Sequence, residues 1–293
     1  MKINILLPCI NSILLIFTIA NSQAEDTITT TEFKSKIMIR ETNKNYDSML
    51  NGMIPFIQNG VDAKENEYPW MVALATKDLN NSHSLFCGGT LISDRIVLTA
   101  AHCNIHPKKT VRVLYGNTAL IKLFINDYEI LDFKSHRDFK EKEGSGPDLA
   151  LIVLKNKIFN PKSIALKISS NPSDYNSKEM TILGWGHTHG ETLISNKLQV
   201  GAVKIYTRDV CNRILNKKNL DPNILCAGGS QNTPAACNYD SGGPGVIELN
   251  DSMEQISVLS FGIPCNENTN VSAYTIISPE IKKWIDATIK EYQ

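Results

Sequence analysis

Asp-Ser-Gly-Gly-Pro at residues 240–244 places a serine in a turn walled by glycines. Upstream, Thr-Ala-Ala-His-Cys at residues 99–103 sets a histidine beside a cysteine, and Asp148 opens an apolar run that ends at Leu154. A serine hydroxyl is a weak nucleophile at neutral pH, so it needs a base within hydrogen-bond reach and a group that orients the base. The three motifs contain the hydroxyl, the imidazole and the carboxylate of such a triad.

Each motif taken alone has an ordinary structural interpretation: a turn serine, a histidine at the edge of a core, or an aspartate at the start of a strand. Their conjunction, in the order His102, Asp148 and Ser241, favours a catalytic triad over three unrelated structural roles.

That order is the order of the chymotrypsin-like serine proteases, and the chain from residue 57 to residue 293 resembles this family. The resemblance implies an all-β fold: two six-stranded antiparallel β-barrels with the active site between them, and a C-terminal α-helix. It also implies a serine endopeptidase, made as a zymogen, that acts on a protein or peptide substrate through an acyl-enzyme and uses no cofactor or metal.

The resemblance assigns a role to each group of the triad. Ser241 is the nucleophile, His102 is the general base and then the general acid, and Asp148 holds the imidazole tautomer and stabilises its cation. Ser260 matches the position whose hydroxyl supports the buried acid. The backbone N–H groups of Tyr239 and Ser241 form the oxyanion hole.

Tyr239 departs from the family pattern, which has glycine at this position. A tyrosine keeps the backbone N–H, but it lacks the freedom of glycine to adopt a positive φ, and its ring crowds the side of the cleft that receives the leaving group. We expect either a strained backbone with the donor kept or a flipped peptide with the donor lost, and in both cases attenuated turnover. The alternative is a backbone that accommodates tyrosine at little cost.

The resemblance places the specificity pocket at Ala235, Gly262 and Ser272. An aspartate at position 235 would select lysine or arginine, whereas alanine supplies no charge. Gly262 leaves one wall open, and Ser272 replaces a glycine on the other wall. We expect a modest preference for apolar residues.

Activation in this family frees an N-terminus that pairs with the aspartate before the nucleophile, here Asp240. The matching cut lies between Phe56 and Ile57, where relatives have a basic residue before the cut. The activating protease is therefore predicted to prefer aromatic residues, unless the chain cuts itself. The alternative is that no cut occurs.

Charge and composition exclude several classes of partner. Lysine plus arginine and aspartate plus glutamate number 30 each in 293 residues, so no charge excess indicates nucleic acid or an anionic membrane.

The N-terminal region predicts secretion to the extracellular space. Met1 and Lys2 precede an apolar stretch with small residues at Ser22 and Ala24, which is typical of a signal peptide at residues 1–24. The alternative, an uncleaved anchor helix, is disfavoured by Pro8 within the stretch. Residues 25–56 are polar and predict a removable pro-segment before a peptidase domain at 57–293.

Six cysteines remain after removal of the signal peptide, and an even number in a secreted chain predicts disulfides. Six cysteines allow 15 pairings, and zinc binding is the alternative, although no Cys-x-x-Cys pair is present. The family resemblance implies the pairs Cys87–Cys103, Cys211–Cys226 and Cys237–Cys265. Glycosylation sequons at Asn80, Asn250 and Asn270 fit a glycoprotein with the sequons on surface loops, and the alternative is that these surface loops are unmodified.

Short apolar runs separated by turn residues predict many β-strands from residue 70 onward. Ser278 and Pro279 predict the start of a helix, as N-cap and first helical residue, with an apolar face that includes Ile281 and Ile285.

A non-catalytic homologue that keeps the fold for binding or regulation is the second hypothesis. The intact His102, Asp148 and Ser241 favour the enzyme, whereas Tyr239 and the Phe56–Ile57 junction favour the homologue.

Overall fold

The computed structural model describes the predicted peptidase domain with gaps. The described residues are 57, 59–140, 145–159, 167–168, 175, 178–186, 195–216, 220–230, 233–249, 252–262 and 269–292. The predicted signal peptide and pro-segment, together with Phe56, Asn250 and Cys265, lie outside them. Among these described residues, no helix combines the length and the apolar character needed to cross a bilayer.

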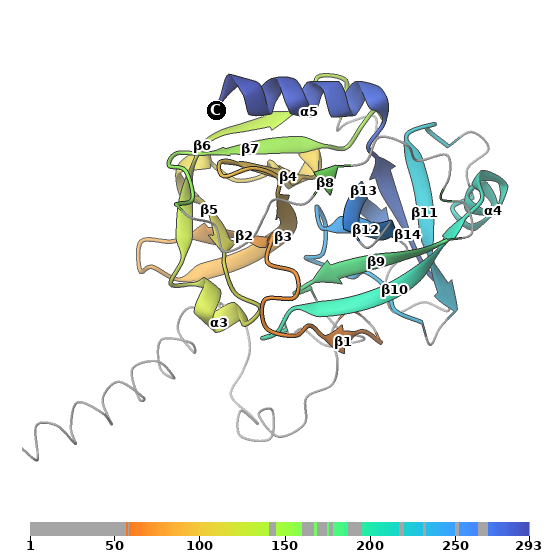
Figure 1. Ribbon diagram of the computed structural model, residues 1–293, viewed down its shortest axis with the longest axis horizontal. Helices are drawn as coiled ribbons and strands as arrows, with labels where there is room; N and C mark the ends of the chain where they lie inside the picture. The colour runs from red at the N-terminus through yellow and green to blue at the C-terminus, as the bar shows by residue number, and fades with distance from the viewer. Residues whose placement is uncertain are drawn as a thin grey trace, which may run out of the picture.

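The first half of the chain forms a closed barrel of six antiparallel strands (Figure 1). Around the barrel the order is β2-β3-β4-β7-β6-β5. The strands are β2 (Met71–Lys77), β3 (His83–Leu91), β4 (Ile96–Thr99), β5 (Val111–Tyr115), β6 (Asp127–Ser135) and β7 (Ala150–Leu154).

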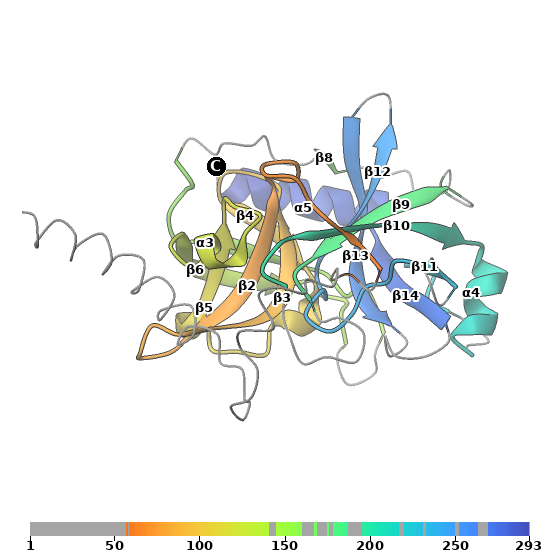
Figure 2. The same cartoon turned by 90° about the horizontal axis from the view of Figure 1, so that it is seen from below.

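The second half forms another barrel, in the order β9-β10-β11-β14-β13-β12, which closes because β9 pairs with both β10 and β12. β1 (Val61–Asp62) adds to β10, and β8 (Lys167–Ile168) adds to β13. The barrel strands are β9 (Glu179–Gly184), β10 (Gln199–Tyr206), β11 (Ile224–Ser230), β12 (Pro244–Leu249), β13 (Ser252–Gly262) and β14 (Thr269–Ile276). The predicted pair of six-stranded barrels is confirmed, and the barrels lie side by side in both ribbon views (Figures 1 and 2).

The pattern of buried side chains differs between strands and decides how clearly each strand can be seen in the sequence. All five residues of β7 are buried, so its run of apolar residues stands out. Along β10, buried and more exposed residues alternate, as expected for a strand with one face toward the core. Each fully buried leucine or isoleucine contributes about 1.5–3 kcal/mol to folding.

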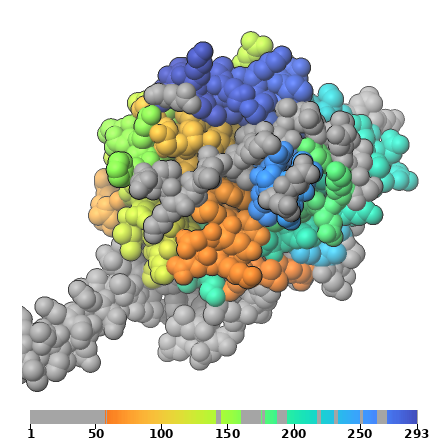
Figure 3. Space-filling view, in the orientation of Figure 1, coloured from red at the N-terminus to blue at the C-terminus, as the bar shows by residue number. Residues whose placement is uncertain are grey.

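The short helices are the 3-10 turns η1 (Ala101–Cys103) and η2 (Lys108–Thr110), and the α-helices α3 (Leu120–Leu123) and α4 (Arg208–Ile214). α5 (Pro279–Glu291) follows the last strand and lies across the surface beside the first barrel (Figures 1 and 3). The Ser278 side chain accepts a hydrogen bond from the Ile281 N–H, so the predicted N-cap is confirmed. Ile281 and Ile285 are buried in the core of the first barrel, which confirms the predicted apolar face.

Two of the three predicted disulfides are confirmed, Cys87–Cys103 and Cys211–Cys226. Cys237 is also disulfide-bonded, and Cys265, its predicted partner, lies outside the described residues.

The surface prediction for the sequons is wrong at one position. Asn270 lies within β14, is 3% exposed, and its amide nitrogen donates to the Thr233 carbonyl at 3.2 Å. Asn80 is exposed in the turn between β2 and β3. The folded domain therefore presents Asn80 to a modifying enzyme and hides Asn270.

We predict that the folded protein carries an N-linked glycan at Asn80 and none at Asn270, because a bulky glycan on a buried strand residue does not fit this fold. Glycopeptide mass spectrometry before and after glycosidase treatment checks both sites, and Asn80→Gln should remove one glycan from the intact mass. A glycan at Asn270 would contradict the prediction.

Candidate active site

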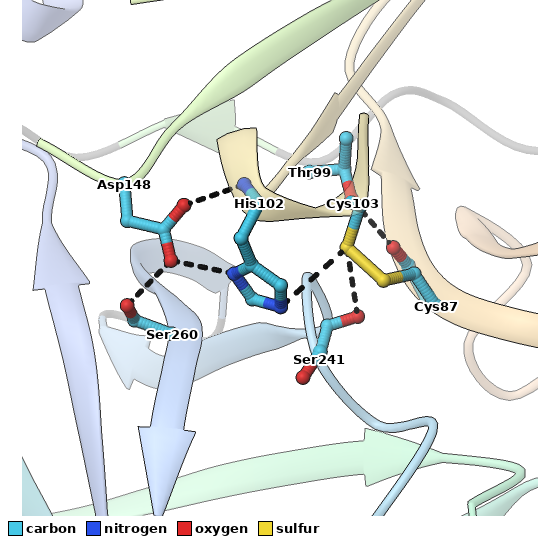
Figure 4. Close-up of a disulfide and its surroundings, with 8 residues drawn as sticks. Cys87, Thr99, His102, Cys103, Asp148, Ser241 and Ser260 are labelled. Carbon is cyan, nitrogen blue, oxygen red and sulfur yellow. Dashed lines mark hydrogen bonds and ion pairs between the residues drawn. A yellow bond between two sulfur atoms is a disulfide. The ribbon is translucent and has the colours of Figure 1, made fainter. Parts of the chain in front are cut away.

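His102 is held by η1, which follows directly after β4. Its backbone N–H donates to Asp148 Oδ1 at 2.9 Å, and its ring Nδ1 lies 2.7 Å from Asp148 Oδ2. The neighbouring Cys103 is bonded to Cys87 on β3, so the disulfide anchors η1 to the barrel wall. The imidazole is thus oriented with Nδ1 toward the carboxylate and Nε2 toward the opposite side (Figure 4).

Asp148 lies just before β7 and is 7% exposed. Its Oδ2 also accepts a hydrogen bond of 2.6 Å from the Ser260 hydroxyl on β13, so donors from both barrels converge on one carboxylate. Burial by itself would raise the pKa of Asp148, but the hydrogen bond and charge of His102, and the Ser260 hydrogen bond, hold the pKa below its usual value. The carboxylate is therefore stabilised in its charged form.

Ser241 lies at the junction of the two barrels, where backbone hydrogen bonds hold it. Its carbonyl accepts from the Gly88 N–H on β3 at 2.7 Å, and the next residue, Gly242, donates to the Leu259 carbonyl on β13 at 2.9 Å. The Cys103 sulfur lies 3.9 Å from the Ser241 carbonyl oxygen and 3.9 Å from His102 Nε2. Serine and imidazole are therefore neighbours on one side of the disulfide (Figure 4).

The hydroxyl of Ser241 makes no hydrogen bond to His102 within the described part of the chain. Such contacts are often long in the free state of an enzyme and shorten when substrate binds, so the geometry is compatible with proton transfer.

Tyr239 has φ 72°, so its backbone keeps the conformation that glycine would favour. It is the third residue of a turn closed by a hydrogen bond of 3.1 Å from the Asp240 N–H to the Cys237 carbonyl. A positive φ at this position defines a type II turn, and a flipped peptide would give type I. The structure therefore has the peptide in the unflipped orientation, with Tyr239 in the φ region that favours glycine. The other described non-glycine residues with positive φ are all asparagines.

Tyr239 as a whole residue is 38% exposed. A positive φ at a residue other than glycine costs roughly 1–3 kcal/mol.

Asp240 is buried and has two backbone donors, the Gly186 N–H to Oδ1 at 2.8 Å and the Cys237 N–H to Oδ2 at 2.9 Å. Burial raises the pKa of Asp240 to about 7, because the two hydrogen bonds offset desolvation only in part. Ile57, which is fully buried, lines the same small pocket as Asp240. The predicted activation residue is therefore beside its predicted partner.

Two glycines make room for the Asp240 carboxylate. A Cβ at Gly184 would lie 1.9 Å from Asp240 Oδ1, and a Cβ at Gly186 would lie 2.5 Å from the same atom. Sequence reasoning missed their contribution to the site, although two glycines flanking a tryptophan were a visible signal.

The three residues of the predicted specificity pocket differ in exposure. Ala235 and Ser272 are buried, at 3% and 4% exposed, whereas Gly262 is exposed. Gly262 is paired with Ser272 between β13 and β14. A Cβ at Gly262 would lie 2.9 Å from the Ser272 hydroxyl oxygen, so Ser272 leaves little room for a side chain at position 262. Phe261, next to Gly262, exposes 43% of its surface.

A protein-family model described as Trypsin matches residues 57–285. The chain belongs to the trypsin family. The match begins at Ile57, the residue that the sequence predicts as the start of the peptidase domain. Membership supports a serine protease-like function in general.

A metal centre is not supported by the cysteines of this trypsin-family site. Cys87, His102 and Cys103 have ligand atoms within 4.8 Å of one another, but the two sulfurs are bonded to each other and are not thiolates.

We predict that Ser260→Ala destabilises the protein by about 1.5–3 kcal/mol at pH 7, because the buried carboxylate of Asp148 loses a donor. The folded pKa of Asp148 is lowered, so this contribution is present above the unfolded pKa and is lost as the pH falls through the folded pKa. Urea unfolding across this acid range measures the loss.

Ser278→Ala is the matched control. It removes a hydroxyl that accepts a backbone hydrogen bond at the start of α5, and it should cost about 1 kcal/mol without this pH dependence. If the two variants lose free energy of unfolding with the same pH dependence from neutral to acid pH, Ser260 does not support a charged Asp148.

Proposed function

We propose that this protein is a secreted serine endopeptidase, made as a zymogen, that hydrolyses peptide bonds through an acyl-enzyme. The observation that carries the proposal is the carboxylate of Asp148, which takes hydrogen bonds from His102 and Ser260 and so directs His102 Nε2 toward the side of Ser241.

In the proposed reaction, Ser241 Oγ attacks the substrate carbonyl carbon while His102 Nε2 takes the hydroxyl proton. The tetrahedral intermediate collapses as the imidazolium returns this proton to the leaving amine, and the acyl group stays on Ser241. Water then attacks the ester with His102 again as base, which releases the acid and restores the hydroxyl. Asp148 stabilises the imidazolium in both halves.

The developing oxyanion would be bound by the backbone N–H groups of Ser241 and Tyr239. The positive φ of Tyr239 supports retention of its donor, while the ring beside it supports slower or more selective turnover than a glycine would allow.

Activation would proceed by a cut between Phe56 and Ile57, made by a protease that accepts aromatic residues or by the enzyme itself. The burial of Ile57 beside Asp240 supports this proposal. The new ammonium group would supply a positive charge beside a carboxylate whose pKa of about 7 reflects desolvation, and the charged form of Asp240 would then be favoured.

The substrate would be a protein or peptide with an apolar residue before the scissile bond. The buried, uncharged Ala235 and the Ser272 side chain beside Gly262 support medium-sized apolar residues. Neither a cofactor nor a nucleic-acid or membrane partner enters the proposal.

The second candidate is a non-catalytic homologue that binds or regulates other proteins. It is favoured by Tyr239 and by the absence of a basic residue at Phe56.

Labelling with a fluorophosphonate, combined with N-terminal sequencing of the secreted protein, separates the two candidates. We predict stoichiometric labelling of Ser241 on a chain that begins at Ile57, and none in Ser241→Ala. No labelling of that matured chain would eliminate the enzyme, whereas labelling with another N-terminus would refute only the activation step.

Peptide libraries test the pocket. We predict cleavage after medium-sized apolar residues, and we expect Ala235→Asp to raise kcat/KM for lysine or arginine at least 100-fold by adding a charge at the pocket base. Ala235→Asn, which has a similar shape and no charge, is the control. Strong cleavage after lysine or arginine by the unaltered protein would show that Ala235 does not form the base.

A further inference from the structure

The Tyr239 side chain lies where the two barrels meet. It lines one small pocket together with Ala73, Leu85, Cys87 and Gly88 of the first barrel and with Gly184 and Trp185 at the end of β9. The residue as a whole is 38% exposed, so it lies at the surface and is covered in part. Tyr239, a turn residue with a positive φ, therefore has apolar neighbours in both barrels.

The two residues after Tyr239 are also attached to both halves. The Asp240 carboxylate accepts at Oδ1 from the Gly186 N–H of the second barrel at 2.8 Å, and the Ser241 carbonyl accepts from the Gly88 N–H of the first barrel at 2.7 Å. The Gly243 N–H donates to the Asp240 carbonyl at 2.9 Å, which closes the following turn. The ring therefore adds side-chain packing at a point where backbone hydrogen bonds already converge.

We propose that Tyr239 is a positioning residue, whose ring braces the turn at residues 237–240 across the two barrels and holds its own N–H in place before any cut after Phe56. The inference rests on the proposed function, because the N–H matters for turnover only if Ser241 is a nucleophile. A glycine at position 239 would supply no such brace, and the turn would then depend on the new N-terminus for its order.

The structure offers variants that separate the ring from the backbone. Tyr239→Phe keeps the ring without its hydroxyl. Tyr239→Asn removes the ring. Asparagine is the residue found at all four of the other described non-glycine positions with a positive φ, so the backbone conformation is retained. Tyr239→Gly removes both the ring and the restriction on φ.

The experiment uses the full chain with residues 52–56 replaced by the recognition sequence of a site-specific processing protease, so that a cut before Ile57 can be made on demand. Hydrogen exchange of the peptide 236–245 is measured by mass spectrometry before and after the cut. This readout requires no catalytic activity.

We expect the uncut chain with Tyr239 or Tyr239→Phe to protect these amides, with less than a three-fold change on cutting. In uncut Tyr239→Asn and Tyr239→Gly, exchange should be at least ten-fold faster, and cutting should restore protection. Fast exchange in the uncut chain with Tyr239, or full protection in uncut Tyr239→Asn, would overturn the proposal.

Fluorophosphonate labelling of the same samples adds the functional readout. The rate for the uncut chain with Tyr239 should lie within ten-fold of its cut form, and uncut Tyr239→Asn should react at least 100-fold more slowly than its own cut form. A labelling ratio that is equal in the two proteins would overturn the proposal. If no form is labelled, the catalytic proposal fails, and hydrogen exchange still decides whether the ring braces the turn.

Discussion

A single buried carboxylate connects the two halves of this protein. Asp148 belongs to the first barrel, and it accepts hydrogen bonds from His102 of the same barrel and from Ser260 of the second. A buried charge is costly unless its oxygens are hydrogen-bonded, so the barrels must meet with these donors in place. The orientation of the imidazole, and therefore the direction of Nε2, follows from this one requirement.

Short motifs made part of the fold and site predictable from the sequence. The apolar run of β7 and the cap and proline of α5 are local signals, and each is confirmed. The pairing of Cys211 with Cys226 and the contact of Ser260 with Asp148 were expected only through family resemblance, because residues distant in sequence give no local sign of their proximity.

The less predictable features depend on contacts between remote segments. The need for glycine at position 184 arises from the Asp240 carboxylate, which is 56 residues further along the chain. Asn270 was expected on the surface because a three-residue sequon contains no information about burial.

The first and last elements of the described domain each pack on the barrel that is more distant in sequence. β1, near the start, pairs with β10 of the second barrel, and α5, at the end, packs on the core of the first. Each barrel is therefore completed by a segment from the opposite end of the polypeptide. During synthesis on the ribosome, the first barrel lacks its covering helix until all strands of the second barrel have been translated, so its core is completed only after the second barrel has been made.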